Sequence, residues 1–216
     1  MSDNPPPISP TGTAPHGEIW SAIRDASAWR GQNRPALFLD RDGIVNVDSG
    51  YVHRLDELEM IAGAADLVRA ANDATVAVIV VTNQSGVGRG YYDWAAFSSF
   101  QTEIERQLAN DGAYIDAAYA CPFHGKARPP YDVNEHPARK PGPGMLLAGA
   151  QALEIDLATS WIVGDRSGDM LAGAAAGLAG GVLVGAQAAI SVPRSFDLRK
   201  ANNTADVLPL IPLLTP

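Results

Sequence analysis

The sequence contains one cysteine, Cys121, among 216 residues, and no long apolar run. A single cysteine excludes an intramolecular disulfide and is typical of a reducing compartment. No stretch reaches the roughly 18 consecutive apolar residues of a membrane-spanning helix, and the N-terminus lacks the basic start and apolar centre of a secretory signal. We therefore expect a cytoplasmic protein with no membrane segment.

Positive charge is also scarce: 16 Lys and Arg stand against 24 Asp and Glu, for a net charge of −8. This balance excludes a broad nucleic-acid-binding surface, which would be basic. It leaves room for a small basic pocket that binds a phosphorylated metabolite. With 46% hydrophobic and 19% charged residues, the composition is that of an ordinary globular protein with a single core.

The composition divides the chain into an N-terminal tail, residues 1–33, and a single domain, residues 34–216. The first half of the tail is rich in Pro, Ser, Thr and Gly, so we expect it to be disordered. In its second half, apolar residues spaced by three and four predict a short amphipathic helix over residues 19–29. Its Trp20 and Trp29 could pack on the domain or on a second subunit.

Strand and helix patterns alternate along the domain. Apolar runs without helical spacing read as strands buried on both faces, and amphipathic segments separate them. The alternation predicts an α/β fold with a doubly wound, mostly parallel sheet. The long Pro-rich stretch 121–143 is expected to form a loop near the active site. The expected strands are 36–39, 76–81, 115–120, 161–163 and 181–184, and the expected helices are 62–72, 93–110 and 144–153.

Polar side chains follow the expected strands. Asp40 and Asp42 come directly after the first strand, and on an extended backbone they point the same way. Thr82 and Asp165 end two other strands, and Lys140 enters from the long loop. Because the carboxyl ends of parallel strands share one edge, these residues should converge there. Two carboxylates this close repel each other unless a cation or a shared proton neutralises them. A solvated Asp-x-Asp-Gly turn is the alternative.

Taken together, these motifs and their order resemble the haloacid dehalogenase (HAD) superfamily of phosphoryl-transfer enzymes. More closely, they resemble its D,D-heptose 1,7-bisphosphate phosphatases, a subfamily that includes the histidinol-phosphate phosphatase domains. The resemblance spans residues 36–184 without a large gap, which implies a HAD-like fold with essentially no cap domain. The motifs that carry it are Asp40-Arg41-Asp42-Gly43, Gly50-Tyr51-Val52, Thr82-Asn83-Gln84-Ser85-Gly86, Arg89-Gly90, Cys121-Pro122, Arg139-Lys140-Pro141 and Val163-Gly164-Asp165.

The resemblance implies a role for each residue at the strand ends. Asp40 would be the nucleophile that forms an aspartyl-phosphate. Mg²⁺ would be held by Asp40, Asp165 and the backbone carbonyl of Asp42, since this ion prefers oxygen ligands. The Asp42 side chain would act as general acid and then as general base. Thr82 would hydrogen-bond the phosphoryl oxygens, and Lys140 would neutralise charge on the phosphate and the nucleophile.

Further residues are candidates for contact with the substrate. Arg139 would grip it, because a guanidinium suits oxyanions, and Tyr51 would contact it as well. Asn83 and Gln84 either bind substrate or satisfy backbone groups of their own loop. Asp169 either orients the metal ligands or is an acidic residue at a helix N-terminus, where acids are favoured.

The sequence departs from the family in the loop after the third strand. Close relatives hold a structural zinc there with Cys-x-His and Cys-x-Cys pairs. Here Cys121 is present, but Phe123 stands where the first histidine would be, and no second cysteine pair follows. Cys121, His124 and His136, with Glu135, form the remaining candidate set for a tetrahedral site. Because the spacing is displaced and soft ligands are lost, we expect the loop to be ordered without zinc, by its prolines and packing.

The resemblance implies an Mg²⁺-dependent phosphatase that removes the C7 phosphate of D-glycero-D-manno-heptose 1,7-bisphosphate. A histidinol-phosphate phosphatase is the first alternative, and a polynucleotide 3′-phosphatase is a more distant one that the acidic charge disfavours. A non-catalytic sugar-phosphate-binding module would have lost Asp40, Asp42, Thr82, Lys140 or Asp165, and none of these is missing. We expect a small phosphorylated sugar as the partner, and a monomer.

Overall fold

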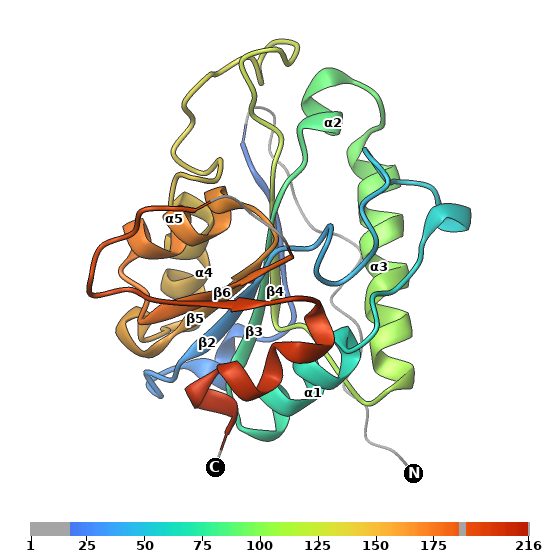
Figure 1. Cartoon of the computed structure of the whole chain (residues 1–216). Helices are drawn as coiled ribbons and strands as arrows, with labels where there is room; N and C mark the ends of the chain where they lie inside the picture. The colour runs from blue at the N-terminus through green and yellow to red at the C-terminus, as the bar shows by residue number, and fades with distance from the viewer. Residues whose placement is uncertain (1–17, 186–188, 216) are drawn as a thin grey trace.

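A computed structural model describes residues 18–185 and 189–215. It is built on a seven-stranded sheet in the order β1-β4-β3-β2-β5-β6-β7, in which only the β1–β4 pair is antiparallel. Helices α1 and α3 cover one face, and α4 and α5 cover the other (Figure 1). The strands are β1 Trp20–Ile23, β2 Ala36–Leu39, β3 Ala77–Asn83, β4 Ala117–Cys121, β5 Trp161–Gly164, β6 Gly180–Val184 and β7 Asp197–Ala201. The α-helices are α1 Ala64–Asp73, α2 Ser85–Arg89, α3 Trp94–Asn110, α4 Gly144–Leu153 and α5 Ser167–Ala176.

The central strand β2 shows why the fold class could be predicted. Leu37 and Leu39 pack into the core beneath α1 and α3, whereas Ala36 and Phe38 pack into the core beneath α4 and α5. None of the four is more than 1% exposed. A strand covered on both faces needs apolar residues at every position, which is the pattern of this run. The doubly wound, mostly parallel sheet predicted from the sequence is confirmed.

The helices lie close to their predicted positions, with one informative difference. The α1 helix begins at Ala64, two residues later than predicted. Gly63 before it has φ +85°, and a Cβ there would lie 2.5 Å from the Cα of Ala205. The chain must therefore turn at this glycine, against the C-terminal segment, before the helix starts. The α2 helix is a single short turn of five residues.

The N-terminal prediction was wrong where the structure tests it. Residues 20–23 form β1, which pairs antiparallel with the free edge of β4, and only Ala26–Trp29 is helical, as a 3₁₀ turn. Trp20 packs edge-on against Phe97 at 5.0 Å between ring centroids, and Trp29 lies in the opposite core. Both tryptophans thus pack on the domain itself. The predicted disorder of the first residues falls outside the described part of the chain.

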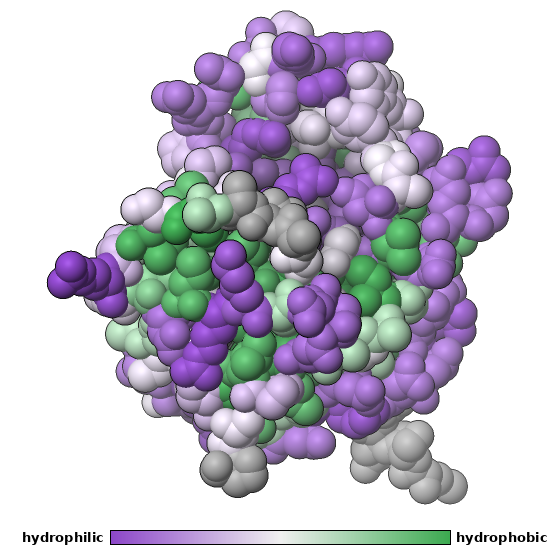
Figure 2. Space-filling model, viewed as in Figure 1, coloured by the Kyte–Doolittle hydropathy of each residue, from purple (hydrophilic) through white to green (hydrophobic). Residues whose placement is uncertain are grey.

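The connections leave the carboxyl edge of the sheet open. Residues 40–76, between β2 and β3, contain the 3₁₀ helix Leu55–Glu57, α1 and loops, with no inserted domain. The 121–143 segment rises above this edge beside α2 (Figure 1). That end of the surface is mostly hydrophilic, whereas apolar side chains gather over the α5 side (Figure 2). Among the described residues, no helix combines the length and apolar character needed to cross a bilayer.

Candidate active site

Asp40 lies directly beyond β2 and is fixed by main-chain and side-chain contacts. Its N–H donates to the carbonyl of Val163 on β5 at 2.9 Å, so the backbone still follows the sheet. Its Oδ1 accepts the N–H of Arg41 at 2.8 Å and lies 2.8 Å from Nζ of Lys140. The residue is 7% exposed. The sequence-predicted nucleophile is therefore a largely buried carboxylate, held at the edge where ligands bind in such sheets.

Lys140 joins the nucleophile to a second carboxylate. Its Nζ lies 2.8 Å from Oδ1 of Asp40 and 2.7 Å from Oδ1 of Asp169, and it donates to the carbonyl of Val81 at 2.7 Å. Burial acts to lower the pKa of Lys140, but Asp169 and Asp40 outweigh it and the net shift is upward. The ammonium therefore stays charged. It offsets one of the negative charges in the site and fixes the position of both carboxylates.

Three carboxylates converge beside this lysine. Asp40, Asp165 and Asp169 each offer an oxygen within 4.8 Å of the others. Oδ1 of Asp165 is buried without a hydrogen-bond partner. Burial raises the pKa of Asp40 to about 7, with Lys140 acting against this shift and Asp169 adding to it. Hard oxygen donors with uncompensated negative charge fit Mg²⁺. Asp169 itself pairs with Lys140 through Oδ1 and accepts the N–H of Arg166 at the start of α5 through Oδ2 at 3.0 Å, which favours its role as an acidic residue at a helix N-terminus. The expected contribution of the Asp42 carbonyl stays a prediction.

Gly43 explains how the chain comes close to this cluster. Its φ is +91°, a conformation that favours glycine, and a Cβ at this position would lie 2.7 Å from Oδ2 of Asp165. The glycine in the Asp-x-Asp-Gly motif thus lets the backbone after β2 lie directly against the carboxylate that follows β5.

The Asp42 side chain is held by residues that the sequence reasoning did not single out. Arg41 donates from Nε at 3.0 Å and from NH2 at 2.8 Å to Oδ1 of Asp42, and Asn46 Nδ2 donates to the same oxygen at 3.0 Å. Arg41 is 1% exposed, and its guanidinium lies over the rings of Phe97 and Phe100 at 5.1 and 5.0 Å. A buried arginine stacked on core aromatics is a rigid support for the expected acid–base carboxylate.

Asn83 and Gln84 are both engaged within the protein. The Asn83 amide donates to the carbonyl of Lys140 and accepts its N–H, both at 3.1 Å. Gln84, 2% exposed, donates from Nε2 to Oδ2 of Asp42 and to Oγ1 of Thr82, both at 2.8 Å. Asn83 thus satisfies backbone groups, those of Lys140, whereas Gln84 holds two side chains of the site, which neither of the two roles left open from the sequence describes. Because Thr82 Oγ1 accepts from Gln84, its own hydroxyl proton remains available for a phosphoryl oxygen.

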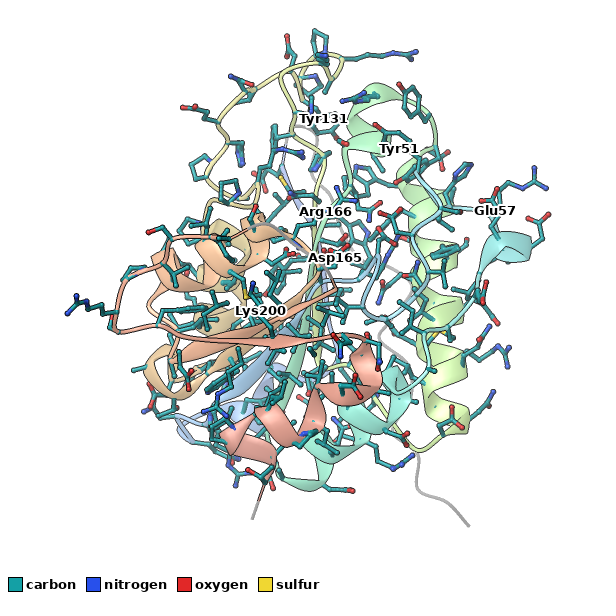
Figure 3. All side chains as sticks on the ribbon, in the orientation of Figure 1. Tyr51, Glu57, Tyr131, Asp165, Arg166 and Lys200 are labelled. Carbon is teal, nitrogen blue, oxygen red and sulfur yellow. The ribbon has the colours of Figure 1, made fainter. Side chains whose placement is uncertain are left out.

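The strand-end residues line one cavity of about 480 Å³ with a basic and aromatic mouth. Arg139 lines it and donates from NH1 to the carbonyl of Phe123 at 3.0 Å. Tyr51, 44% exposed, also lines it. Arg166 pairs with Asp48 at 2.8 Å across the same mouth. Figure 3 shows Asp165 and Arg166 beneath the level of Tyr51. The structure thus brings together Asp40, Asp42, Tyr51, Thr82, Asn83, Gln84, Arg139, Lys140 and Asp169 around this cavity, and Asp165 joins the carboxylate cluster in it.

The candidate zinc residues are not gathered into one group in the described structure. In the part of the chain that the structure describes, the only groups of three or more side chains placed to share an ion come from the aspartate cluster. Cys121 is buried, and burial raises the pKa of its thiol to about 11. His124 lies by Arg89, and the His136 ring stacks on Phe123.

We expect purified protein to hold far less than one zinc per chain. After dialysis against zinc-free buffer, elemental analysis by mass spectrometry should find only traces, and thermal stability should not respond to a zinc chelator. A tightly bound stoichiometric zinc would contradict this expectation and would require Cys121, His124 and His136 to rearrange.

A buried aspartate, a buried lysine and a cluster of carboxylates at the carboxyl edge of a doubly wound sheet define a phosphatase of the HAD type. A family model described as HAD-hydrolase-like matches residues 137–192. A D-glycero-β-D-manno-heptose-1,7-bisphosphate 7-phosphatase from Mesorhizobium japonicum is 41% identical over 181 residues, 83% of each chain. The protein of the same name from Escherichia coli K12 is 43% identical over 150 residues, 69% of this chain and 78% of its own.

Solved structures give the same result. A putative HAD-like phosphatase from Mesorhizobium loti superimposes with a TM-score of 0.85 at 36% identity, covering 94% of this chain and 96% of its own. The D,D-heptose 1,7-bisphosphate phosphatase of B. bronchiseptica, complexed with magnesium and phosphate, gives 0.67 at 31% identity, covering 80% and 95%. The chain belongs to the D-glycero-β-D-manno-heptose-1,7-bisphosphate 7-phosphatase family of HAD-like hydrolases.

Proposed function

We propose that this chain removes the C7 phosphate of D-glycero-D-manno-heptose 1,7-bisphosphate and leaves the 1-phosphate. The observation that carries the proposal is the buried carboxylate of Asp40, clamped by Lys140 beside two further carboxylates in a cavity with a basic mouth. Relatives at 41–43% identity, named for this activity, support the choice of substrate.

In the first step Asp40 attacks the C7 phosphorus. The hydrogen bonds from Arg41 and Lys140 both end on Oδ1 of Asp40, so we assign the attack to Oδ2. A P–O bond to Oδ2 forms while the bond from phosphorus to the sugar oxygen breaks. Thr82 donates its hydroxyl proton to a phosphoryl oxygen, and the Lys140 ammonium stabilises the charge that builds on the phosphoryl group.

Asp42 moves the protons in both steps. As a protonated acid it gives its proton to the departing sugar oxygen. As a carboxylate it then takes a proton from the water that attacks phosphorus, which releases inorganic phosphate and restores Asp40. Arg41, Asn46 and Gln84 hold this carboxylate at the cavity wall throughout. The geometry it needs is therefore present before substrate binds.

Removal of divalent metal should abolish the activity. Mg²⁺ held by Asp40, Asp165 and the backbone carbonyl of Asp42 would offset the repulsion between the nucleophile and a phosphate dianion. Without it three carboxylates face the substrate with one ammonium between them. We expect EDTA to lower the rate at least about 10³-fold and added Mg²⁺ to restore it. Full activity in EDTA would contradict the proposed role of the cluster.

The decisive experiment compares phosphate release from the heptose bisphosphate and from histidinol phosphate, with Mg²⁺. We expect kcat/KM to favour the bisphosphate by about two orders of magnitude or more, roughly 2.7 kcal/mol of transition-state discrimination. A preference for histidinol phosphate would assign the chain to the other branch of the subfamily. If neither substrate is hydrolysed and Asp40→Asn protein behaves like wild type, the chain is a non-catalytic binding module.

Two further expectations belong to this proposal. We expect the active form to be a monomer. The single cysteine lies buried as a thiol, which supports a cytoplasmic enzyme. Light scattering on the purified protein tests the first.

A further inference from the structure

The 121–143 loop is organised around a pair of stacked rings that come from its two ends. The rings of Phe123 and His136 lie 3.7 Å apart between centroids and are inclined by 9°. Phe123 is 3% exposed, and the ring of Tyr131 meets it edge-on at 5.6 Å. Ring pairs of this kind add to the free energy gained by apolar burial, so the contact joins the two ends of the loop.

Both stacked residues also hold Arg139. The carbonyl of Phe123 accepts the guanidinium NH1 of Arg139 at 3.0 Å, and the carbonyl of His136 accepts its backbone N–H at 2.9 Å. Nδ1 of His136 accepts the N–H of Ala138 at 3.1 Å and fixes the turn between them. A shift of either ring would therefore move Arg139, which lines the cavity next to Lys140.

The middle of the loop is attached to the helices beside the cavity. Trp94 on α3 donates from Nε1 to the Tyr131 hydroxyl at 3.4 Å, and the N–H of Arg128 donates to the carbonyl of Gly88 on α2 at 2.8 Å. The rings of Phe123, Tyr131 and His136 are thus connected to α2 and α3. This connection can restrict the movement of Arg139.

We propose that the Phe123–His136 ring pair orders this loop, in place of the structural zinc that the family resemblance implies there. The residue at the place of a zinc-binding histidine is itself one half of the pair, and the candidate zinc ligands do not converge in the described structure. Phe123 and His136 are positioning residues: they act through Arg139 and touch no reacting atom. Their effect on the heptose substrate rests on the proposed function.

Four substitutions distinguish the effect of the stacked rings from the effect of the neighbouring hydrogen bonds. Phe123→Leu removes one ring, and His136→Asn removes the other while an oxygen still accepts the N–H of Ala138. His136→Phe keeps a ring and loses that acceptor. Val133→Ala is the matched control, because Val133 belongs to the same loop and is exposed. His136 is itself only partly buried, so its variants should fold even where Phe123→Leu does not.

Limited trypsin digestion reads the order of the loop without any substrate. We expect cleavage after Lys126 and Arg139 to become about tenfold faster in Phe123→Leu and His136→Asn, since opening of the loop then costs less. It should stay within about twofold of wild type in His136→Phe and Val133→Ala, which keep the stack. The chelator 1,10-phenanthroline should leave the wild-type rate unchanged. The proposal would be overturned if the chelator made cleavage of the wild type faster. It would also be overturned if Phe123→Leu and His136→Asn were cleaved at the same rate as Val133→Ala.

Kinetics then locate the effect at Arg139. With the heptose bisphosphate, the ring-free variants should raise KM about tenfold with kcat within about twofold, because binding is weakened and the chemical step is not. Mg²⁺-dependent hydrolysis of p-nitrophenyl phosphate, which lacks the second phosphate and the sugar, should be unaffected. If the bisphosphate is not a substrate at all, the proposed function fails while the digestion experiment still decides the inference. A matching loss of kcat on both substrates would overturn the positioning role.

Discussion

Asp40→Asn protein should fold normally and have lost phosphatase activity by about four orders of magnitude or more. An amide in place of the carboxylate cannot form the acyl phosphate, but it retains an oxygen for the hydrogen bonds from Arg41 and Lys140. Burial disfavours the charged form of Asp40, whose pKa is raised to about 7. The neutral replacement should therefore leave the melting temperature unchanged or slightly higher.

The comparison variant for Asp40→Asn is Asp48→Asn. Asp48 pairs with Arg166 at the mouth of the cavity, so the same change of charge there leaves the reacting groups intact. We expect kcat for Asp48→Asn within about threefold of wild type, as is usual for a solvent-exposed ion pair. Steady-state kinetics and thermal melts of both proteins make the test. Residual activity above about 1% in purified Asp40→Asn would show that another group attacks phosphorus.

Asp42→Asn should produce an enzyme that stops halfway. Loss of a general acid–base group typically costs about 10²- to 10⁴-fold. The rate of the first step should fall less with p-nitrophenyl phosphate than with an alkyl phosphate such as the heptose, because nitrophenolate leaves without a proton. The second step needs the base for every substrate. The phosphorylated enzyme should therefore accumulate.

A stopped-flow burst of nitrophenolate, close to one per active site, is the expected signature of Asp42→Asn. Mass spectrometry of acid-quenched protein should show one added phosphoryl group, and the group should be absent from Asp40→Asn. Equal losses for both kinds of leaving group, without a burst, would remove Asp42 from the proton transfers and leave it a structural partner of Arg41.

The convergence of the site could be predicted because it depends only on sheet topology. Once four apolar runs are taken as parallel strands, the residues that follow them must meet at one edge. Asp40, Thr82 and Asp165 were located in this way, and Lys140 was located by its place in the motif order. Nothing about side-chain orientation was needed for this conclusion.

The supporting contacts could not be predicted, because they depend on which side chain fills which gap. Arg41 lies between two predicted site residues in the sequence, and an arginine there would be expected at the surface. It is instead buried against core aromatic rings. Asn83 and Gln84 have several possible partners, and only the packed structure selects among them. The segment Trp20–Ile23 is so short that its apolar spacing fits both a helix and a strand. It forms a strand because it pairs with the free edge of β4.

The order of strands in the sheet affects how the chain folds during and after its synthesis on the ribosome. The central strand β2 pairs on one side with β5, so Leu37 lies opposite Trp161 from the distal part of the chain. A nascent chain that ends before β5 already contains Asp40, Asp42 and Thr82 but lacks Asp165 and Asp169, and its middle strand has an unpaired edge. Contacts between such distant segments form late and slowly. Recovery of activity during refolding should therefore mark the last step, the closing of the sheet, rather than the collapse that precedes it.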